Sequence, residues 1–217
     1  MTARDAQPPR IPDPDSPWRP VRERARSREL KRDAVILAAA RAFKERGYHN
    51  TSLDDLAARL HVTKPTIYHY VENKEQILFE CFRTGLDRIR AGFAAVERSA
   101  APGRERLAVV VRSYAEAVAS DFGWCMVRAE NQDLSPAMSR RIKALKSEID
   151  QGLRQLVTDG ILDGSIRADC DPKMTAFALA GALNWIAHWH RPGESLTAAG
   201  IADLFLDLFE NGLRPRS

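Results

Sequence analysis

Apolar residues recur every three or four positions along most of the chain, which is the spacing of one buried face of an α-helix. Ile36, Ala39, Ala40 and Phe43 begin the pattern, and Gly47 follows where a glycine commonly ends a helix. No stretch reads convincingly as a β-strand, so the pattern predicts an all-α protein. Further helices are expected at 52–60, 63–69, 73–86, 104–120, 124–131, 136–160, 172–190 and 197–212.

Residues that favour helix starts stand at the expected places in the first half of the chain. Ser52 and Thr63 can each cap the short helix that follows, and Pro65 falls where its missing N–H does no harm. Asn73 and Gln76 form a capping pair for a longer helix. These signals predict a small N-terminal three-helix unit followed by a larger helical bundle.

Composition divides the chain into three parts. Residues 1–27 are expected to form a disordered, basic and proline-rich arm, because each proline fixes φ and removes a hydrogen-bond donor. Residues 28–74 hold the three-helix unit, and residues 75–217 hold the bundle. The first 74 residues carry 15 Lys and Arg against 10 Asp and Glu, whereas the remainder carries 18 against 19. This imbalance is compatible with a nucleic-acid partner and also with a solvated tail.

The overall composition excludes several classes of protein. The 217 residues are 44% hydrophobic and 29% charged, which is ordinary for a globular protein. No window approaches the ~18–20 apolar residues of a membrane span, and the N-terminus has no signal peptide, so we expect a cytoplasmic protein without a membrane partner. Cys81, Cys125 and Cys170 are far apart in the sequence and are expected to be reduced thiols.

The sequence patterns of common catalytic sites are missing. The chain has no HExxH pair, glycine-rich phosphate loop or nucleophile elbow. His188 and His190 are two residues apart, so a helix would direct them about 200° apart. We therefore expect neither an enzyme nor a metal or cofactor site.

Residues 52–70, SLDDLAARLHVTKPTIYHY, have the pattern of a helix, a tight turn and a second helix. Leu56, Leu60, Val62 and Ile67 are expected on the buried side. The outward side of the second helix carries hydroxyls, a cation and polar aromatic rings, which suit a helix in a DNA major groove. A plain three-helix packing unit is the alternative. The outward residues are Thr63, Lys64, Thr66, Tyr68 and His69.

Residues 36–78 resemble the DNA-binding domain of the TetR/AcrR family of bacterial regulators. The shared pattern includes the first helix, the Gly-Tyr turn, the Thr-Ser start of the second helix and Thr-Ile-Tyr-x-Tyr before Asn-Lys-Glu. The resemblance implies a DNA contact for each of several side chains. These contacts are to phosphate for Thr51 or Ser52, Tyr68, His69 and Lys74, and to base edges for Lys64 and Thr66.

Two positions depart from the family pattern. His61 stands where the family usually has glycine in the turn, and histidine tolerates a positive φ better than a β-branched residue does. Val71 replaces a frequent phenylalanine. Both could alter the placement of the DNA-reading helix.

A regulator of this kind implies a second copy and a trigger. The helices expected at 172–190 and 197–212 carry long apolar faces with no later segment to cover them, and they resemble the dimerising pair of the family. Two-fold symmetric operators likewise call for a homodimer. A small-molecule effector is expected inside the bundle, although aromatic residues at helical spacing are more often core. The candidate contacts are Phe93, Tyr114, Phe122, Trp124, Met126, Arg128, Asn131, Asn184, Trp185 and His188.

Residues 182–192, ALNWIAHWHRP, resemble a branch of the family that controls fatty-acid and steroid breakdown. Some members of that branch respond to acyl-CoA thioesters, so the resemblance implies a repressor that such an effector releases from DNA. The CoA phosphates could meet basic side chains. The arginines that we consider for this role are Arg128, Arg140, Arg141 and Arg191.

Two alternatives remain open at this point. An efflux-type regulator would sense a drug-like lipophile, and a cationic drug would need buried acids, for which Glu116 and Glu130 are the nearby candidates. A helical module that binds protein rather than DNA would show little dependence on salt, whereas phosphate contacts impose a steep one.

Overall fold

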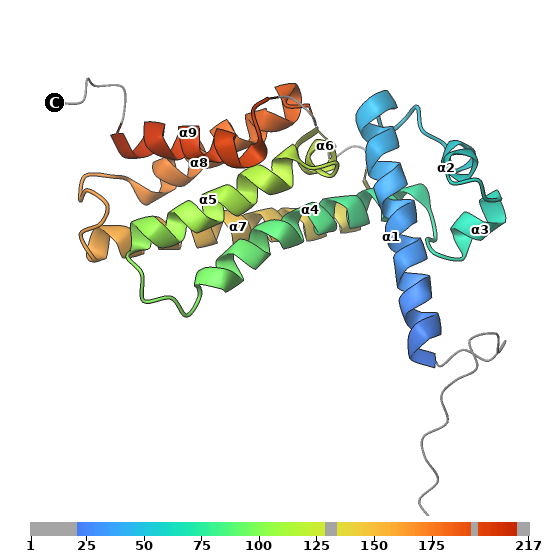
Figure 1. Ribbon diagram of the computed structural model, residues 1–217, viewed down its shortest axis with the longest axis horizontal. Helices are drawn as coiled ribbons and strands as arrows, with labels where there is room; N and C mark the ends of the chain where they lie inside the picture. Colours follow the sequence, from blue (N-terminus) through green and yellow to red (C-terminus); the bar gives the residue numbers. More distant parts are fainter. Residues whose placement is uncertain (1–20, 129–133, 192–194, 212–217) are drawn as a thin grey trace, which may run out of the picture.

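The computed structural model describes residues 21–128, 134–191 and 195–211. Every regular element within these residues is a helix (Figure 1), which confirms the all-α prediction. The helices are α1 (Val21–Arg46), α2 (Leu53–Arg59), α3 (Lys64–Tyr68), α4 (Lys74–Val96), α5 (Gly103–Ala119), α6 (Gly123–Arg128), α7 (Pro136–Leu162), α8 (Pro172–Trp189) and α9 (Ala198–Asn211).

The first helix begins earlier than the sequence pattern indicates. Residues 21–27, which the composition places in the arm, are the first part of α1. The last proline of the arm is Pro20, and the segment that follows is rich in Arg, Glu and Ala, which are good helix formers. The expected arm is therefore wrong for residues 21–27, and residues 1–20 lie outside the described part of the chain.

The short helices α2 and α3 lie beside α1, and α4 leads from this unit into the bundle of α5 to α9 (Figure 1). Within the small unit, Ile36 and Phe43 of α1 pack with Leu56 of α2 and Ile67 of α3. Each of these four side chains is at most 3% exposed. Burial of such side chains contributes about 1.5–3 kcal/mol each, so the four fix the angle between the three helices.

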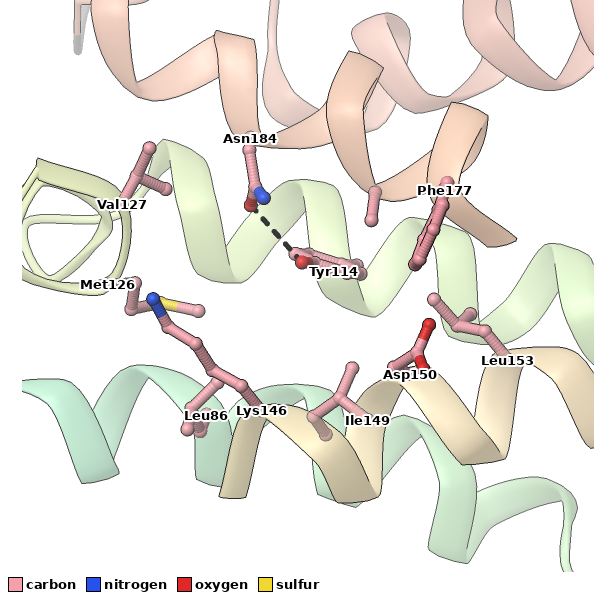
Figure 2. A pocket seen from close by; sticks show the side chains of 11 residues that line it. Leu86, Tyr114, Met126, Val127, Lys146, Ile149, Asp150, Leu153, Phe177 and Asn184 are labelled. Carbon is pink, nitrogen blue, oxygen red and sulfur yellow. Dashed lines mark hydrogen bonds between the residues drawn. The ribbon is translucent and has the colours of Figure 1, made fainter. Parts of the chain in front are cut away.

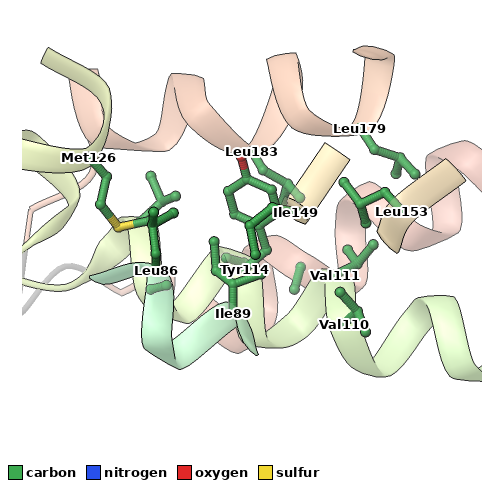
Figure 3. Packing of buried hydrophobic residues seen from close by; sticks show 14 of the residues in the cluster. Leu86, Ile89, Val110, Val111, Tyr114, Met126, Ile149, Leu153, Leu179 and Leu183 are labelled. Carbon is green, nitrogen blue, oxygen red and sulfur yellow. The ribbon is translucent and has the colours of Figure 1, made fainter. Parts of the chain in front are cut away.

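The bundle has α5 at its centre, where it contacts α4, α7, α8 and α9. Figure 3 shows Tyr114 of α5 packed with Leu86 and Ile89 of α4 and with Leu183 of α8. The apolar residues that recur every three or four positions in the sequence therefore form the buried faces of these helices.

The segment around α6 joins the two cores. Phe122 and Cys125 belong to the core of the small unit, whereas Met126 belongs to the core of the bundle. Adjacent side chains of one short segment thus pack into different halves of the protein.

Candidate DNA-binding face and effector cavities

The turn between α2 and α3 is held by a capping box and by its own backbone. Ser52 Oγ accepts a hydrogen bond from the Asp55 N–H at 3.1 Å, and Asp55 Oδ2 accepts from the Ser52 N–H at 2.8 Å. Hydrogen bonds from Ser52 hold the pKa of the Asp55 carboxyl below its usual value. His61 has a φ of 53°, so the turn does use the positive φ considered for this position. The Val62 N–H then donates to the Ala57 carbonyl at 3.0 Å.

The buried side of this motif is smaller than the sequence pattern predicts. Leu56 and Ile67 are fully buried, but Val62 is 39% exposed and Leu60 is only half-buried. Val62 lies in the turn itself, where the spacing of an α-helix no longer sets the direction of side chains. The prediction is therefore wrong for Val62.

The outward side of α3 carries most of the predicted DNA contacts. Thr63, Lys64 and His69 are exposed, and Tyr68 is 50% exposed. Thr66 is half-buried and shares a hydrogen bond of 2.9 Å between its hydroxyl and that of Thr63. Thr63 therefore occupies the N-cap position without the predicted side-chain cap. The face presents an ammonium, a phenol, an imidazole and hydroxyls, which together can bond base edges and phosphates.

Lys64 is held by a carboxylate in the free protein. Its Nζ lies 2.7 Å from Asp54 Oδ2 on α2, and this hydrogen bond raises the pKa of the Lys64 ammonium. Both side chains are largely exposed, so the pair contributes little to folding stability. An acceptor group on DNA could therefore replace Asp54 at small cost.

The three contacts predicted outside α3 differ in how the structure places them. Thr51 is 1% exposed and donates to the Gly47 carbonyl at 2.9 Å, so its side chain cannot reach a phosphate and that contact is wrong. Ser52 is exposed at the start of α2. Lys74 lies at the start of α4, where its Nζ donates to the His49 carbonyl at 3.5 Å.

A first cavity of about 250 Å³ lies inside the bundle, between α4, α5, α6, α7 and α8. Figure 2 shows the Tyr114 hydroxyl directed at Asn184, to whose Oδ1 it donates at 3.1 Å. Burial raises the pKa of Tyr114 to about 12, so the phenol is neutral at physiological pH. Lys146 and Asp150 come from α7 to the same cavity (Figure 2). The lining residues are Leu86, Tyr114, Met126, Val127, Lys146, Ile149, Asp150, Leu153, Phe177, Ala180 and Asn184.

The two charged residues of this cavity were not predicted from the sequence. Lys146 is exposed as a whole residue, yet burial of its ammonium lowers its pKa. Asp150 pairs with Arg154 at 2.6 Å, so its charge is already compensated. Of the two glutamates considered for a cation, Glu116 is exposed and Glu130 lies outside the described residues. The cavity is therefore mainly apolar, with a neutral hydrogen-bonding pair and the Lys146 ammonium, which lies 5.0 Å from the centroid of the Phe82 ring and has no ion pair among the described residues.

A second cavity of about 200 Å³ lies at the junction of α1, α6 and the end of α8. Trp124 and Arg128 reach it from α6, and His188 from α8. These three were predicted as effector contacts, but they share no cavity with Tyr114. The remaining lining residues are Lys44, Ala187, Trp189, His190 and Arg191.

The other predicted effector contacts line neither cavity. Phe93 and Phe122 are packing residues, with the Phe93 ring against Gly152 and Phe122 buried in the core of the small unit. Trp185 is 60% exposed and stacks on His188 with ring centroids 4.3 Å apart. Aromatic rings at helical spacing look the same whether they face a core, a cavity or solvent, so the sequence could not separate these cases. Asn131 lies outside the described residues.

Comparison with known families assigns both halves of the chain. Residues 35–81 match the family described as bacterial regulatory proteins, tetR family. Residues 100–213 match the family described as tetracyclin repressor-like, C-terminal domain. The chain belongs to the TetR family.

Similar proteins span nearly the same length as this TetR-family chain. The transcriptional repressor KstR2 of Rhodococcus jostii is 27% identical over 188 residues, which cover 84% of this chain and 91% of KstR2. The crystal structure of PfmR from Thermus thermophilus matches with a TM-score of 0.76 at 28% identity, covering 83% of this chain and 99% of PfmR. The crystal structure of AibR in complex with isovaleryl coenzyme A and operator DNA matches with a TM-score of 0.71 at 29% identity, covering 82% of this chain and 96% of AibR. These relatives are transcriptional regulators, which confirms the expectation of a DNA-binding regulator rather than an enzyme.

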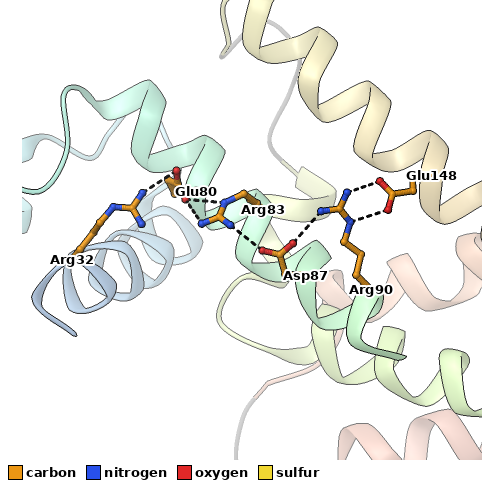
Figure 4. A network of polar contacts seen from close by, with 6 residues as sticks. All are labelled: Arg32, Glu80, Arg83, Asp87, Arg90 and Glu148. Carbon is orange, nitrogen blue, oxygen red and sulfur yellow. Dashed lines mark hydrogen bonds and ion pairs between the residues drawn. The ribbon is translucent and has the colours of Figure 1, made fainter. Parts of the chain in front are cut away.

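In this TetR-family regulator, a chain of ion pairs connects the DNA-binding unit to the helix that lines the first cavity (Figure 4). Arg32 of α1 bonds Glu80 of α4 at 2.9 Å, and Glu80 also bonds Arg83 at 2.8 Å. Arg83 then bonds Asp87 at 3.2 Å. The chain continues through Arg90, which bonds Asp87 at 3.3 Å and Glu148 of α7 at 3.1 Å through its Nε. Glu148 lies between Lys146 and Asp150 in the sequence, so the network joins the cavity-lining part of α7 to α1.

The three cysteines of the regulator are free thiols. Cys81 and Cys125 are buried free thiols and Cys170 is a half-buried one, as expected. Burial raises the pKa of the Cys81 thiol. In the described segments, no helix is long and apolar enough to cross a membrane.

Proposed function

We propose that the protein is a homodimeric repressor that binds a palindromic operator and is released from it by a small lipophilic effector. The observation that carries the proposal is the combination, in one chain, of an exposed polar face on α3 and a largely apolar cavity between the helices that follow α4. The polar face supplies the DNA contacts, and the cavity supplies a place for the trigger.

The outer surface of α8 and α9 supports the homodimer. Six large apolar side chains on these two helices are 39–60% exposed, which a monomer in water would not favour as a continuous surface. Gly181 of α8 is also exposed, and a Cβ placed there would meet nothing within 4 Å, so a second backbone could approach closely. A palindromic operator would then require the two α3 helices of the dimer to lie about 34–36 Å apart, one turn of DNA. The six residues are Met174, Phe177, Trp185, Leu204, Leu208 and Phe209, of which Phe177 also borders the first cavity.

The first cavity favours an effector with an acyl chain and a carbonyl group. Its walls are mainly aliphatic, and the Tyr114–Asn184 pair can reorganise to bond a carbonyl oxygen. The similar structure of AibR with isovaleryl coenzyme A supports an acyl-CoA. A cationic drug is less well matched, because Asp150 is already neutralised by Arg154.

Effector binding would act by preferring the state that is off the DNA. The helix α4 carries Leu86 at the cavity and Lys74 at the DNA-binding unit. A shift of α4 would therefore change the distance between the two α3 helices of the dimer. The coupling must be reciprocal, so operator DNA would weaken effector binding by the same factor.

The experiment is fluorescence anisotropy with labelled duplexes that tile the DNA upstream of the gene. Tyr68→Ala should weaken binding to every bound sequence, because a phosphate contact carries no sequence information. Lys64→Ala should instead cost about 1–3 kcal/mol at one base pair and relax the preference there. Lys143→Ala, an exposed lysine on α7, is the matched control for loss of charge.

Salt dependence separates the proposal from the alternative of a protein-binding module. Log affinity should fall with log salt concentration with a slope near −0.9 for each phosphate contacted. Parental affinity in Tyr68→Ala would contradict the assignment of α3. No binding to any duplex at low salt would contradict the repressor itself.

A further inference from the structure

The second cavity differs from the first in chemistry, although the two share walls. On α6, Met126 and Val127 line the first cavity, while Trp124 and Arg128 line the second. On α8, Asn184 lines the first and His188 the second, one helical turn or ~6 Å further along the axis. The two cavities are therefore neighbours, with α6 and α8 bordering both.

The second cavity is lined by positive charge. Lys44, Arg128 and Arg191 supply three cations, and His188 and His190 supply two imidazoles. No carboxylate lines the cavity among the described residues. Within those residues, no ion pair joins the three cations to an acid, whereas Arg83 and Arg90 of α4 are both bonded to carboxylates. Unmatched cations gathered around a hollow attract a multiply charged anion.

His190 gives an independent sign of an incomplete site. Its Nδ1 is buried and has no hydrogen-bond partner, while its Nε2 lies 3.3 Å from the Leu196 carbonyl oxygen. A buried polar atom without a partner costs about 1–3 kcal/mol, so such atoms usually mark a place where a further group belongs. A phosphate oxygen could accept a hydrogen bond from an Nδ1–H of this ring.

The aromatic rings of the cavity indicate the kind of anion. Trp124 is half-buried and Trp189 is 37% exposed, so both indoles have accessible surface. Indole rings stack on planar nucleobases, and guanidinium groups bind phosphates through two parallel bonds. Indole and guanidinium groups around one hollow are suited to a nucleotide rather than to a simple inorganic anion.

We propose that the second cavity binds the phosphate-bearing nucleotide part of a two-part effector, whose acyl part occupies the first cavity. This inference rests on the proposed function, because it assigns the effector of the same regulator. Lys44 belongs to α1 of the DNA-binding unit, whereas Arg128 and Arg191 belong to the effector-binding half. Phosphates bound by Lys44, Arg128 and Arg191 connect α1 to α6 and to the end of α8. The nucleotide part therefore acts directly on the orientation of the DNA-binding unit.

The test uses the full-length protein and probes that separate the two parts. Coenzyme A and adenosine 3′,5′-bisphosphate carry the nucleotide without an acyl chain, and an isovaleryl pantetheine thioester carries the acyl part without the nucleotide. Isothermal titration calorimetry should show saturable binding of coenzyme A at one site per protomer. Binding of adenosine 3′,5′-bisphosphate alone would identify the nucleotide, rather than the pantetheine arm, as the group recognised.

Three variants locate the site. Arg128→Ala and Lys44→Ala should each weaken coenzyme A binding about tenfold or more, because each removes a charge-assisted bond. Both should leave the pantetheine thioester unaffected. Arg98→Ala is the matched control, since Arg98 is also an exposed arginine but lines neither cavity.

Two results would overturn the inference. One is parental affinity for coenzyme A in both Arg128→Ala and Lys44→Ala, and the other is no binding of either nucleotide probe at millimolar concentration. Operator binding, measured by anisotropy on the same preparations, reports the proposed repressor separately. Tight operator binding without any nucleotide binding would therefore refute this inference while leaving the repressor intact.

Discussion

Gly85 of α4 controls the size of the first cavity through its contact with Met126. A Cβ at this position would lie 2.2 Å from Met126 Sδ and 2.6 Å from Met126 Cγ. Both distances are too short, so Gly85→Ala must displace the thioether. Met126 lines the cavity of about 250 Å³, and this empty space is where its flexible side chain can move.

The expected magnitudes follow from two opposing terms. Alanine in a helix interior is favoured over glycine by about 1 kcal/mol, and repacking an overfilled core costs about 1–3 kcal/mol. The free energy of unfolding should therefore fall by no more than ~2 kcal/mol. If the displaced thioether excludes two methylenes of the effector at ~0.8 kcal/mol each, effector affinity falls about 15-fold.

The assay is effector-dependent release of the labelled operator duplex, with thermal denaturation measured in parallel. Gly85→Ala should bind the operator as the parent does but need about 15-fold more effector for half release. The double variant Gly85→Ala/Met126→Ala removes the clashing atoms and should recover most of the response. An unchanged half-release concentration in Gly85→Ala would refute the reasoning.

Three further substitutions test other parts of the structure. Asp54→Asn should strengthen operator binding up to ~5-fold, because the carboxylate no longer competes with DNA for Lys64; weaker binding in anisotropy would contradict this. Gly103→Ala should lower the free energy of unfolding in urea by about 3 kcal/mol, because its Cβ would lie 2.3 Å from the backbone nitrogen of Gly160 and would force α5 away from α7. A parental midpoint of urea unfolding would exclude that close contact. Glu148→Gln should change stability by less than ~1 kcal/mol yet reduce the coupling between effector and operator by about 0.5–2 kcal/mol. The ratio of effector affinities with and without operator measures that coupling, and an unchanged ratio would show that the ion-pair chain of Figure 4 carries none of it.

The DNA-binding unit was largely predictable because its signals are local. The capping box of Ser52 and Asp55 and the positive φ of His61 depend on residues at most three positions apart. The three wrong predictions in this unit concern the direction of side chains in turns: the burial of Val62, the phosphate contact of Thr51 and the side-chain cap of Thr63. In a turn, direction is set by the packing of neighbouring helices, and no periodic pattern reports it.

The effector cavities were only partly predictable because their walls come from distant segments. Tyr114, Met126 and Asn184 were found as polar or soft residues on apolar faces, but Lys146 and Asp150 were missed. On α7 these two charges look like any solvated helix face. Only the placement of α7 against α4, α6 and α8 turns that face toward a cavity, and a single sequence does not contain that placement.

The segment around α6 shows why the two halves of the protein cannot move independently. Phe122 and Cys125 are packed with α1 and the start of α4, whereas Met126 is packed against the bundle. Arg41 of α1 also bonds Asp121, just before Phe122, at 2.9 Å. Close-packed cores do not deform continuously, so a displacement of the α6 backbone must be absorbed on the α1 side as well. The flexible thioether of Met126 alone can instead move into the first cavity. Because both cavities have α6 as a wall, a ligand in either one acts on the same short helix. The position of α6 therefore supports the proposed coupling, in which an effector changes the geometry of a DNA-reading helix that it does not touch.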